Sequence, residues 1–317
     1  MTDLKVISPL VDLQSYGMEP RLPEVCDASS MNDYLNCPSL YYHRHVLGLA
    51  AKGPEAPHFS WGTRWHDVLF TYYHEYSLND ALEVLIDDWP DTLGDLDPKA
   101  RTLDRMLKIF PKYVEDIGIP AQKAWEVVRR EQYFDVECPA DNPDCPYPWK
   151  GCDLRWCGRM DKISELLRRK HDYVHDYKTT GYLHRHYFDS HKHGIQIPGY
   201  CWGASHLLGR LVRHARVDLL HCTKTQFKFE YRDFRYGDER IWEWLQNVKH
   251  IWGQIQAQFE YFHSMPEMWI KNWNECKRLW DCPFVDVHHT VPLDDRETRM
   301  AVLEQDYIVD RWDPSHV

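Results

Sequence analysis

The sequence predicts an α/β protein in which one central sheet is flanked by helices. Five short runs are rich in β-branched and aromatic residues and are bounded by polar or turn-forming residues, as strands are. They cover 125–136, 155–167, 172–179, 215–222 and 227–234. Several other segments place apolar residues at helical spacing. They cover 31–49, 61–76, 79–89, 98–117 and 238–263.

The composition is that of a soluble protein with a sizeable core. The 317 residues are 43% hydrophobic, enough for one large domain or two small ones. No apolar run is long enough to span a bilayer, and the first residues do not resemble a signal peptide, so we expect a cytoplasmic location. The net charge of −11 argues against bulk electrostatic coating of nucleic acid, so phosphate contacts would be local. Candidates for such contacts are Arg129, Arg130, Arg159, Lys162, Arg168, Arg169 and Lys170.

An extended arm and a broken helix are predicted at the start of the chain. Residues 1–28 contain 3 prolines and little periodicity, which is typical of an extended arm. Ser29 and Ser30 would cap the helix over 31–49. Within it Cys37 precedes a proline, which either breaks the helix or divides it into two short ones.

The helix over 61–76 carries the first candidate ligand. Ser60 would cap it, and its Trp, Leu and Tyr residues form an apolar stripe with His66 beside it. On the residues alone, a histidine beside such a stripe is more often a packing residue than a ligand. The helices that follow are expected to form an insertion at about 77–120, ahead of the sheet.

A hairpin is predicted where a short basic stretch separates the strands over 155–167 and 172–179. Side chains alternate along a strand, so Asp176 and Lys178 point to the same face. If Asp161 pairs on that face, two carboxylates can hold a hard cation through oxygen. Lys178 would then orient the attacking water or neutralise charge on a phosphate. This set of residues suits metal-dependent cleavage of a phosphodiester.

The motifs around these residues resemble those of the PD-(D/E)XK nuclease superfamily, in its RecB-like branch of exonucleases. That branch includes the RecB and AddB nuclease domains, CRISPR-associated RecB-like exonucleases and phage-encoded relatives. The family order is a helix with a metal-binding histidine, then Gly-Arg-x-Asp, Asp-Tyr-Lys-Thr and Gln-x-x-x-Tyr. The matching positions, in that order within residues 29–210, are His66, Asp161, Asp176 with Lys178, and Gln196 with Tyr200.

The resemblance implies a restriction-endonuclease-like core, a central mixed sheet flanked by helices, in a single nuclease domain over 29–292. It implies that His66, Asp161 and Asp176 hold Mg²⁺ or Mn²⁺, with the Tyr177 carbonyl as a further ligand. The implied activity is hydrolysis of DNA, exonucleolytic on single strands or ends, in recombination, repair or phage DNA processing.

The resemblance also implies roles for residues that do not bind the metal. Lys178 would activate water, and Gln196 and Tyr200 would position the substrate. Glu131, on the preceding strand, is either a further metal-binding or water-orienting group or an ion-pair partner of a neighbouring arginine.

The 10 cysteines suggest thiols or metal ligands more than disulfides. Four of them could bind zinc, although their spacing is not that of paired zinc knuckles; they are Cys138, Cys145, Cys152 and Cys157. The tail resembles the segment in which iron–sulfur members of the family place three cysteines, which join an early one to hold a [4Fe–4S] cluster. The corresponding set is Cys37, Cys276, Cys282 and His288, with the histidine in place of the last cysteine. It would hold a cluster or zinc, or only pack.

Two other classes of protein stay open on this sequence. One is a nucleic-acid-binding subunit with an inactive nuclease fold, although every core motif residue is present. The other is a scaffold organised by zinc or an iron–sulfur cluster. Residues 293–317 are predicted to be an acidic tail without a clear pattern.

Overall fold

The computed structural model describes residues 18–53, 57–89, 102–137, 154–276, 282–289, 296–311 and 313. The chain divides into two compact units, one over 54–245 and one that combines 1–53 with 246–317. The domain predicted over 29–292 therefore includes residues of both units.

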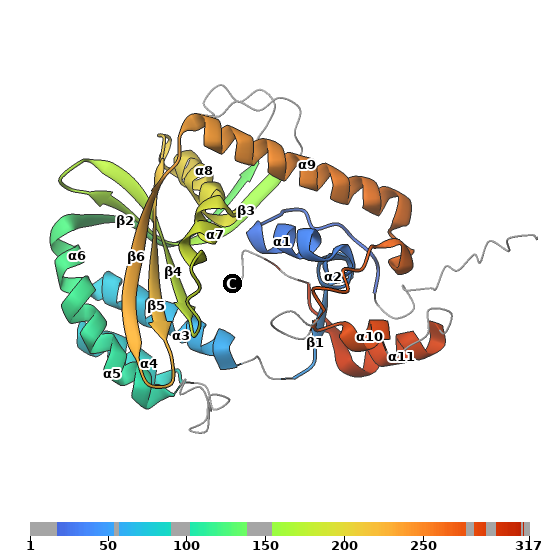
Figure 1. Cartoon of the computed structure of the whole chain (residues 1–317), viewed down its shortest axis with the longest axis horizontal. Helices are drawn as coiled ribbons and strands as arrows, with labels where there is room; N and C mark the ends of the chain where they lie inside the picture. The colour runs from blue at the N-terminus through green and yellow to red at the C-terminus, as the bar shows by residue number, and fades with distance from the viewer. Residues whose placement is uncertain are drawn as a thin grey trace, which may run out of the picture. The chain divides into compact units, whose positions relative to one another are not determined.

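The unit over 54–245 is built on a five-stranded mixed sheet in the order β2-β3-β4-β5-β6 (Figure 1). The strands are β2 (Trp125–Glu137), β3 (Arg155–Leu166), β4 (His171–Thr180), β5 (His214–Cys222) and β6 (Phe227–Arg235). β4 and β5 are parallel, and the other neighbours are antiparallel. All five predicted strands occur, within a residue or so of the predicted limits, and the α/β class with a mixed central sheet is confirmed.

Helices flank this sheet on both sides (Figure 1). One layer consists of α3 (Pro57–Glu75), α4 (Leu78–Asp87), α5 (Leu103–Tyr113), the π-helical turn η4 (Val114–Gly118) and α6 (Ile119–Ala124). Apolar side chains of this layer share one hydrophobic core with Tyr177 of β4 and Leu220 of β5. The helices expected as an insertion thus help to bury the sheet. The other side carries α7 (Tyr187–His193) and α8 (Gln196–Leu208).

Small residues bring α8 close to the sheet. A Cβ atom on Gly203 would lie 2.4 Å from the ring of Phe134 on β2. A Cβ atom on Gly158 of β3 would lie 3.0 Å from the ring of Tyr200 on α8. Both positions therefore need glycine for steric reasons, and the close approach holds α8 against β2 and β3.

The second unit contains mostly short elements. They are α1 (Ala28–Asn36), α2 (Pro38–Tyr41), the π-helix η2 (Tyr42–Val46), the 3₁₀ turn η5 (Pro266–Met268), α10 (Val285–His289), α11 (Arg296–Asp306), and the antiparallel pair β1 (Leu49–Ala51) and β7 (Tyr307–Val309). α9 (Asp238–Phe262) contributes residues to both units. Within the part of the chain that the structure describes, none of the helices has the length and apolar character that crossing a bilayer requires.

Two predicted helix caps are wrong. α1 is capped by Asp27, whose side chain accepts a hydrogen bond from the backbone N–H of Ser30 at 2.8 Å, while the Ser30 hydroxyl accepts one from the N–H of Asp27. This reciprocal capping box satisfies two N–H groups, one more than a serine cap alone would satisfy. α3 begins at Pro57, so Ser60 lies inside the helix. The helix break at Cys37 occurs as predicted, with two short helices around it.

Part of the predicted tail has regular structure. α11 has little apolar character, and β7 pairs with β1 from the other end of the chain. Local periodicity cannot reveal a strand pair that depends on a partner so far away in sequence.

Gly203→Ala is expected to lower the free energy of unfolding by about 1–3 kcal/mol, because the added methyl group would meet the Phe134 ring in a packed interface. Gly253→Ala is the matched control, since that glycine is exposed on α9 with open space around an added Cβ, and it should stabilise by up to about 1 kcal/mol. Chemical denaturation measures both. Wild-type stability of Gly203→Ala would show that α8 does not depend on this close approach.

Candidate active site

Three acidic residues form a row across β2, β3 and β4. The register of β2 and β3 puts Glu131 opposite Asp161. The register of β3 and β4, extended by one residue past its last pair, puts Asp161 opposite Asp176. Residues opposite each other on neighbouring strands are the closest cross-strand neighbours, so three carboxyl groups are gathered on one stretch of the sheet.

His66 joins this row from α3. Its Nδ1 lies 3.1 Å from Oδ1 of Asp161. Among the described residues, His66, Glu131 and Asp161 are the one set of three whose ligand atoms all lie within 4.8 Å of one another. Glu131 has a φ of +39°, in the left-handed region that side chains usually avoid. One nitrogen and several carboxylate oxygens form a donor set that suits Mg²⁺ or Mn²⁺.

Asp176 is the most buried acid of the row, with 2% of its surface exposed. Lys178 Nζ donates a hydrogen bond to Asp176 Oδ1 at 2.8 Å. The second oxygen, Oδ2, is buried and has no hydrogen-bond partner among the described residues. Because an unsatisfied buried carboxylate oxygen is costly, this atom fits a position that a cation would complete.

Asp161 is tied to the neighbouring strand through the backbone. Its Oδ2 accepts a hydrogen bond from the backbone N–H of Tyr177 at 2.5 Å. The side chain of Tyr177 is buried in the core beneath the α3–α6 layer. Tyr177 therefore meets the acids through its main chain, and its carbonyl as a metal ligand stays a prediction.

The charges of these groups are coupled. Burial disfavours a charged His66, but the charge of Asp161 and its hydrogen bond outweigh burial and raise the pKa of His66 to about 9. Burial, assisted by the Asp161 charge, raises the pKa of Glu131 to about 7. Burial also raises the pKa of Asp176, against the attraction of Lys178. Close carboxyl groups in a low dielectric retain protons that a bound cation would displace.

Gln196 and Tyr200 lie together at the start of α8. Gln196 Nε2 donates a hydrogen bond to the Tyr200 hydroxyl at 2.9 Å, as the predicted four-residue spacing on one helix face allows. The Tyr200 ring also meets Phe134 edge-on, with centroids 6.1 Å apart. The first turn of α8, with its free backbone N–H groups and positive dipole end, adds partial positive charge beside this pair.

α7 carries two further residues that the sequence did not indicate, one influenced by the charge of Asp176 and the other by that of Lys178. Burial raises the pKa of Tyr187, and so does the nearby charge of Asp176. Burial lowers the pKa of His191 to about 4, with the Lys178 cation contributing. The two rings lie 4.9 Å apart. The signal that could have found them is the concentration of histidines over 184–193, directly after β4.

Lys162 does not face the surface. It is 3% exposed, and its Nζ lies 3.6 Å from the centre of the Tyr73 ring. Burial lowers the pKa of this amine to about 7. The expectation that Lys162 contacts phosphate is therefore wrong, because strand alternation turns it away from Asp161 and into the core.

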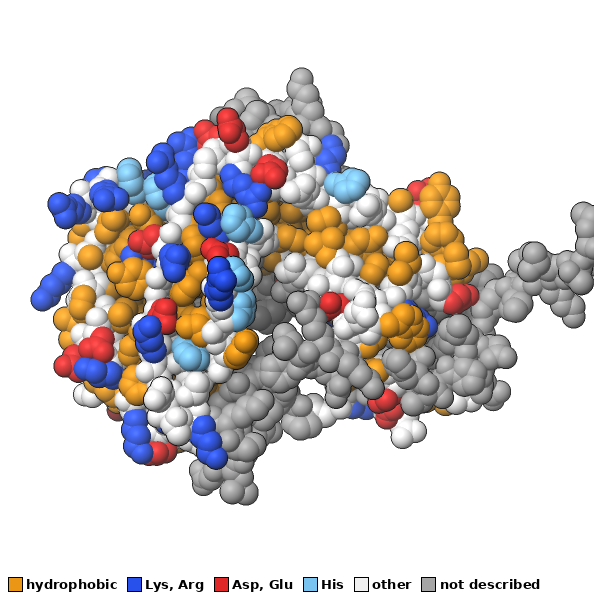
Figure 2. Space-filling model, viewed as in Figure 1, with side chains coloured by type: hydrophobic (Ala, Val, Ile, Leu, Met, Phe, Trp, Pro, Cys, Tyr) orange, Lys and Arg blue, Asp and Glu red, His pale blue; other side chains and the backbone are white. Residues whose placement is uncertain are grey.

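The surface of this unit is locally basic although the chain is acidic. On the face shown in Figure 2, lysine, arginine and histidine side chains gather over the region of β4–β6 and α7. Exposed basic residues of β6 and α7 include Lys192, Lys228, Arg232 and Arg235. Local phosphate contacts are thus compatible with the net charge of −11.

Hydrogen bonds that involve the backbone of Asn272 and Cys276 connect Cys37, Cys276 and Cys282 in the second unit. The backbone N–H of Asn272 donates to Cys37 Sγ at 3.4 Å, and Cys276 Sγ donates to the Asn272 carbonyl at 3.8 Å. The N–H of Cys282 donates to the Cys276 carbonyl at 3.1 Å. Burial, then the charges of the other two cysteines, raises the pKa of the Cys282 thiol. His288 lies in α10, and its side chain is outside the described residues, so the fourth predicted ligand stays a prediction.

The other cysteine group cannot be assembled from the described residues. Cys138, Cys145 and Cys152 lie outside them, while Cys157 is buried in β3. The second zinc site stays a prediction.

A family model described as the PD-(D/E)XK nuclease superfamily matches residues 28–287. The chain belongs to this superfamily. No curated protein matches it. Members of the PD-(D/E)XK superfamily are hydrolytic nucleases that generally use divalent metals, and the His66, Glu131 and Asp161 group is a possible metal site in this member.

Among solved structures, 27 chains match. One is a Eubacterium rectale protein titled "Putative exonuclease", 15% identical, which covers 92% of this chain and 94% of its own with a TM-score of 0.48. Another is the protein SSO0001, 14% identical, covering 86% of this chain and 90% of its own with a TM-score of 0.34.

Binding of Mn²⁺ at this site is expected to weaken as the pH falls from about 9 towards 6, because protons compete with the metal at His66 and Glu131. With His66 protonated below its raised pKa, affinity should drop by about tenfold per pH unit from about pH 9 to about pH 7, and more steeply below about 7, where Glu131 also takes up a proton. Isothermal titration calorimetry in buffers of different ionisation enthalpy measures the affinity and the protons released. His66→Gln should flatten the profile above pH ~7, where only His66 still competes, whereas His74→Gln, an exposed site on the same helix, should not. An unchanged profile in His66→Gln would contradict this assignment.

Proposed function

We propose that the chain is a metal-dependent DNA nuclease of the RecB-like branch, an exonuclease acting on single strands or DNA ends in recombination, repair or phage DNA processing. The observation that carries the proposal is the buried Asp176 oxygen that no described residue hydrogen-bonds, opposite Asp161 and beside Lys178. An acidic pair can hold a divalent metal and an adjacent ammonium can offset phosphate charge, so together they suit phosphodiester hydrolysis.

Each residue near the acids has a chemical task in this proposal. His66, Asp161 and Asp176 would hold Mg²⁺ or Mn²⁺, which stabilises negative charge on the phosphate and makes water more acidic. Lys178, held by Asp176, donates hydrogen bonds that orient the attacking water and offset charge on the scissile phosphate. Glu131, whose pKa is about 7, is suited to accept a proton from that water near neutral pH.

The substrate contacts come from the helices on the α8 side of the sheet. Gln196 and Tyr200 present an amide and a hydroxyl at the start of α8, where a phosphate oxygen would be stabilised by the helix dipole. Tyr187 and His191 of α7 offer aromatic surfaces against which an unpaired base could stack. Both rings are half-buried, so a base would reach only the part of each ring that solvent reaches, and an unpaired nucleotide does this more readily than a base-paired one.

The three cysteines lie near one another through contacts with the Asn272 and Cys276 backbone, which supports a metal in the second unit as a structural element. Binding would require their Sγ atoms to move closer together than they stand here. Cys37, Cys276, Cys282 and His288 would hold a [4Fe–4S] cluster or zinc there. Metal analysis of the purified protein, with Cys37→Ser as the comparison, identifies the element. Such a site would organise the fold and would not replace the acids of the nuclease centre.

Asp176→Ala and Lys178→Ala are each expected to reduce DNA cleavage by about a hundredfold or more while the fold is retained, because each removes a charge from the reacting centre. Cleavage of end-labelled single- and double-stranded DNA with Mn²⁺ measures activity, and circular dichroism measures folding. Asp104→Ala and Lys108→Ala are matched controls from an exposed pair on α5. Full activity in both test variants would reject the proposal.

The form of the substrate distinguishes an exonuclease from an endonuclease. Linear single strands should be degraded from their ends in Mn²⁺, and addition of EDTA should stop the reaction. Circular single strands should survive. Cleavage of the circles would keep the nuclease assignment and refute the exonuclease assignment.

A further inference from the structure

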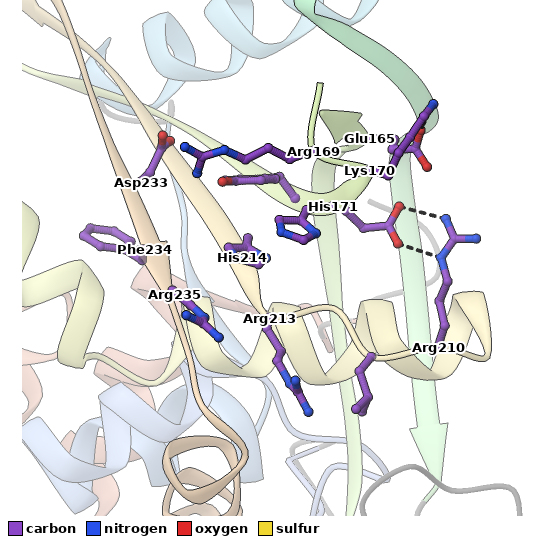
Figure 3. Close-up of a pocket in the computed structure, with 13 residues that line it drawn as sticks. Glu165, Arg169, Lys170, His171, Arg210, Arg213, His214, Asp233, Phe234 and Arg235 are labelled. Carbon is purple, nitrogen blue, oxygen red and sulfur yellow. Dashed lines mark hydrogen bonds and ion pairs between the residues drawn. The ribbon is translucent and has the colours of Figure 1, made fainter. Parts of the chain in front are cut away.

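A second concave site lies in the unit over 54–245, away from the row of acids. It is a cavity of about 730 Å³ where β4 and β5 begin, next to the C-terminal ends of α8 and β6 (Figure 3). This volume is in the range of pockets that enclose ligands of the size of a nucleotide. Nothing in the nuclease chemistry requires it.

Most charges around this cavity are already paired. Arg210 makes two hydrogen bonds to the carboxylate of Asp172, at 2.6 and 2.8 Å. The remaining pairs are Lys170 with Glu165, Arg213 with Asp238, and Arg216 with Asp233. Among the described residues, no carboxylate pairs with Arg169 or Arg235, which both line the cavity. The uncompensated charge at this site is therefore that of two guanidinium groups.

The two unpaired guanidinium groups flank a stack of aromatic rings. His171 and His214 are parallel to within 7°, with ring centroids 4.8 Å apart. Tyr173 stacks against His214 at 4.9 Å. In the view of Figure 3, Arg169 and Arg235 lie on opposite sides of the two imidazoles. Burial lowers the pKa of His214, and His171 and both arginines lower it further, so the positive potentials of Arg169 and Arg235 overlap at one ring.

The cavity is separate from the nuclease centre. β4 pairs without interruption from Tyr173 to Thr180, so its side chains alternate regularly. His171 and Tyr173 therefore point to the face of the sheet opposite that of Asp176 and Lys178. Along the strand, His171 and Asp176 are about 17 Å apart at the usual rise per residue.

We propose that this cavity binds a nucleotide unit, with the phosphate attracted by the positive charge of Arg169 and Arg235 on the cavity lining and the base lying against the His171–His214 stack. Guanidinium groups match phosphate oxygens in geometry and charge, and an unpaired pair of them in a pocket is a site for a phosphate dianion or diester. The stacked rings provide the flat surface that a base requires. The nucleotide unit is either a free mononucleotide or one residue of a nucleic-acid strand, and the chemistry of recognition is the same for both.

Binding is measured with the whole chain in EDTA, which prevents cleavage and leaves the metal centre out of the measurement. The probes are deoxyadenosine 5′-monophosphate, followed by calorimetry, and a short fluorescent single-stranded oligonucleotide, followed by anisotropy. Arg169→Gln and Arg235→Gln are each expected to weaken binding by about tenfold or more, because a charge-assisted contact to phosphate is lost. Arg168→Gln is the matched control, since this exposed arginine belongs to the same turn but does not line the cavity; it should change binding by less than about twofold.

The two probes identify the source of the ligand. Arginine-dependent binding of the monophosphate assigns a free nucleotide, and arginine-dependent binding of the oligonucleotide alone assigns a strand. The proposal is overturned when neither probe binds, when Arg169→Gln and Arg168→Gln bind equally, or when deoxyadenosine binds as tightly as its 5′-monophosphate. Cleavage in Mn²⁺ by the same variants is a separate readout, so loss of the pocket and failure of the nuclease assignment give different results.

Discussion

The candidate site of the 54–245 unit depends on holding two carboxyl groups next to each other in a largely buried place. Asp161 and Asp176 face each other across the β3–β4 hairpin, and their mutual repulsion opposes this arrangement. The chain offsets the repulsion with different partners for each acid. His66 and the Tyr177 N–H stabilise Asp161, while Lys178 stabilises one oxygen of Asp176 and no residue in the described part of the chain hydrogen-bonds the other. A divalent cation bound between the two carboxyl groups would offset their repulsion and supply a partner for this second oxygen of Asp176.

These side chains come from separate elements, so the packing between layers decides whether they meet. The imidazole comes from α3, whose apolar face is fixed in the core that includes Tyr177. The amide and phenol come from α8, which lies close to the sheet because glycine stands at positions 158 and 203. Rigid, close-packed elements of this kind position polar groups more accurately than loops do. The packing of the hydrophobic core therefore determines the positions of the polar side chains at the candidate site.

The distribution of charge reconciles an acidic chain with a polyanionic substrate. A net charge of −11 would repel nucleic acid if it were spread evenly. Instead, basic side chains gather over β4–β6 and α7, and the cavity at the start of β4 and β5 holds two arginines that no described carboxylate neutralises. Recognition by a few placed cations is less sensitive to net charge, because screening in solution limits the range of the other charges to about 10 Å.

Strand periodicity and turn residues by themselves determined the β3–β4 hairpin and the common face of Asp176 and Lys178. These features depend on neighbours in the chain, which is why local patterns and the family motifs predicted them. Only the tertiary structure decided which residues from distant segments meet. It brought Tyr187 within electrostatic range of Asp176 and His191 within range of Lys178, turned Lys162 into the core, paired β1 with β7, and placed Arg169 and Arg235 around one cavity. Contacts between distant segments depend on how the layers pack and on which strands are neighbours. The periodicity of a single segment cannot predict them.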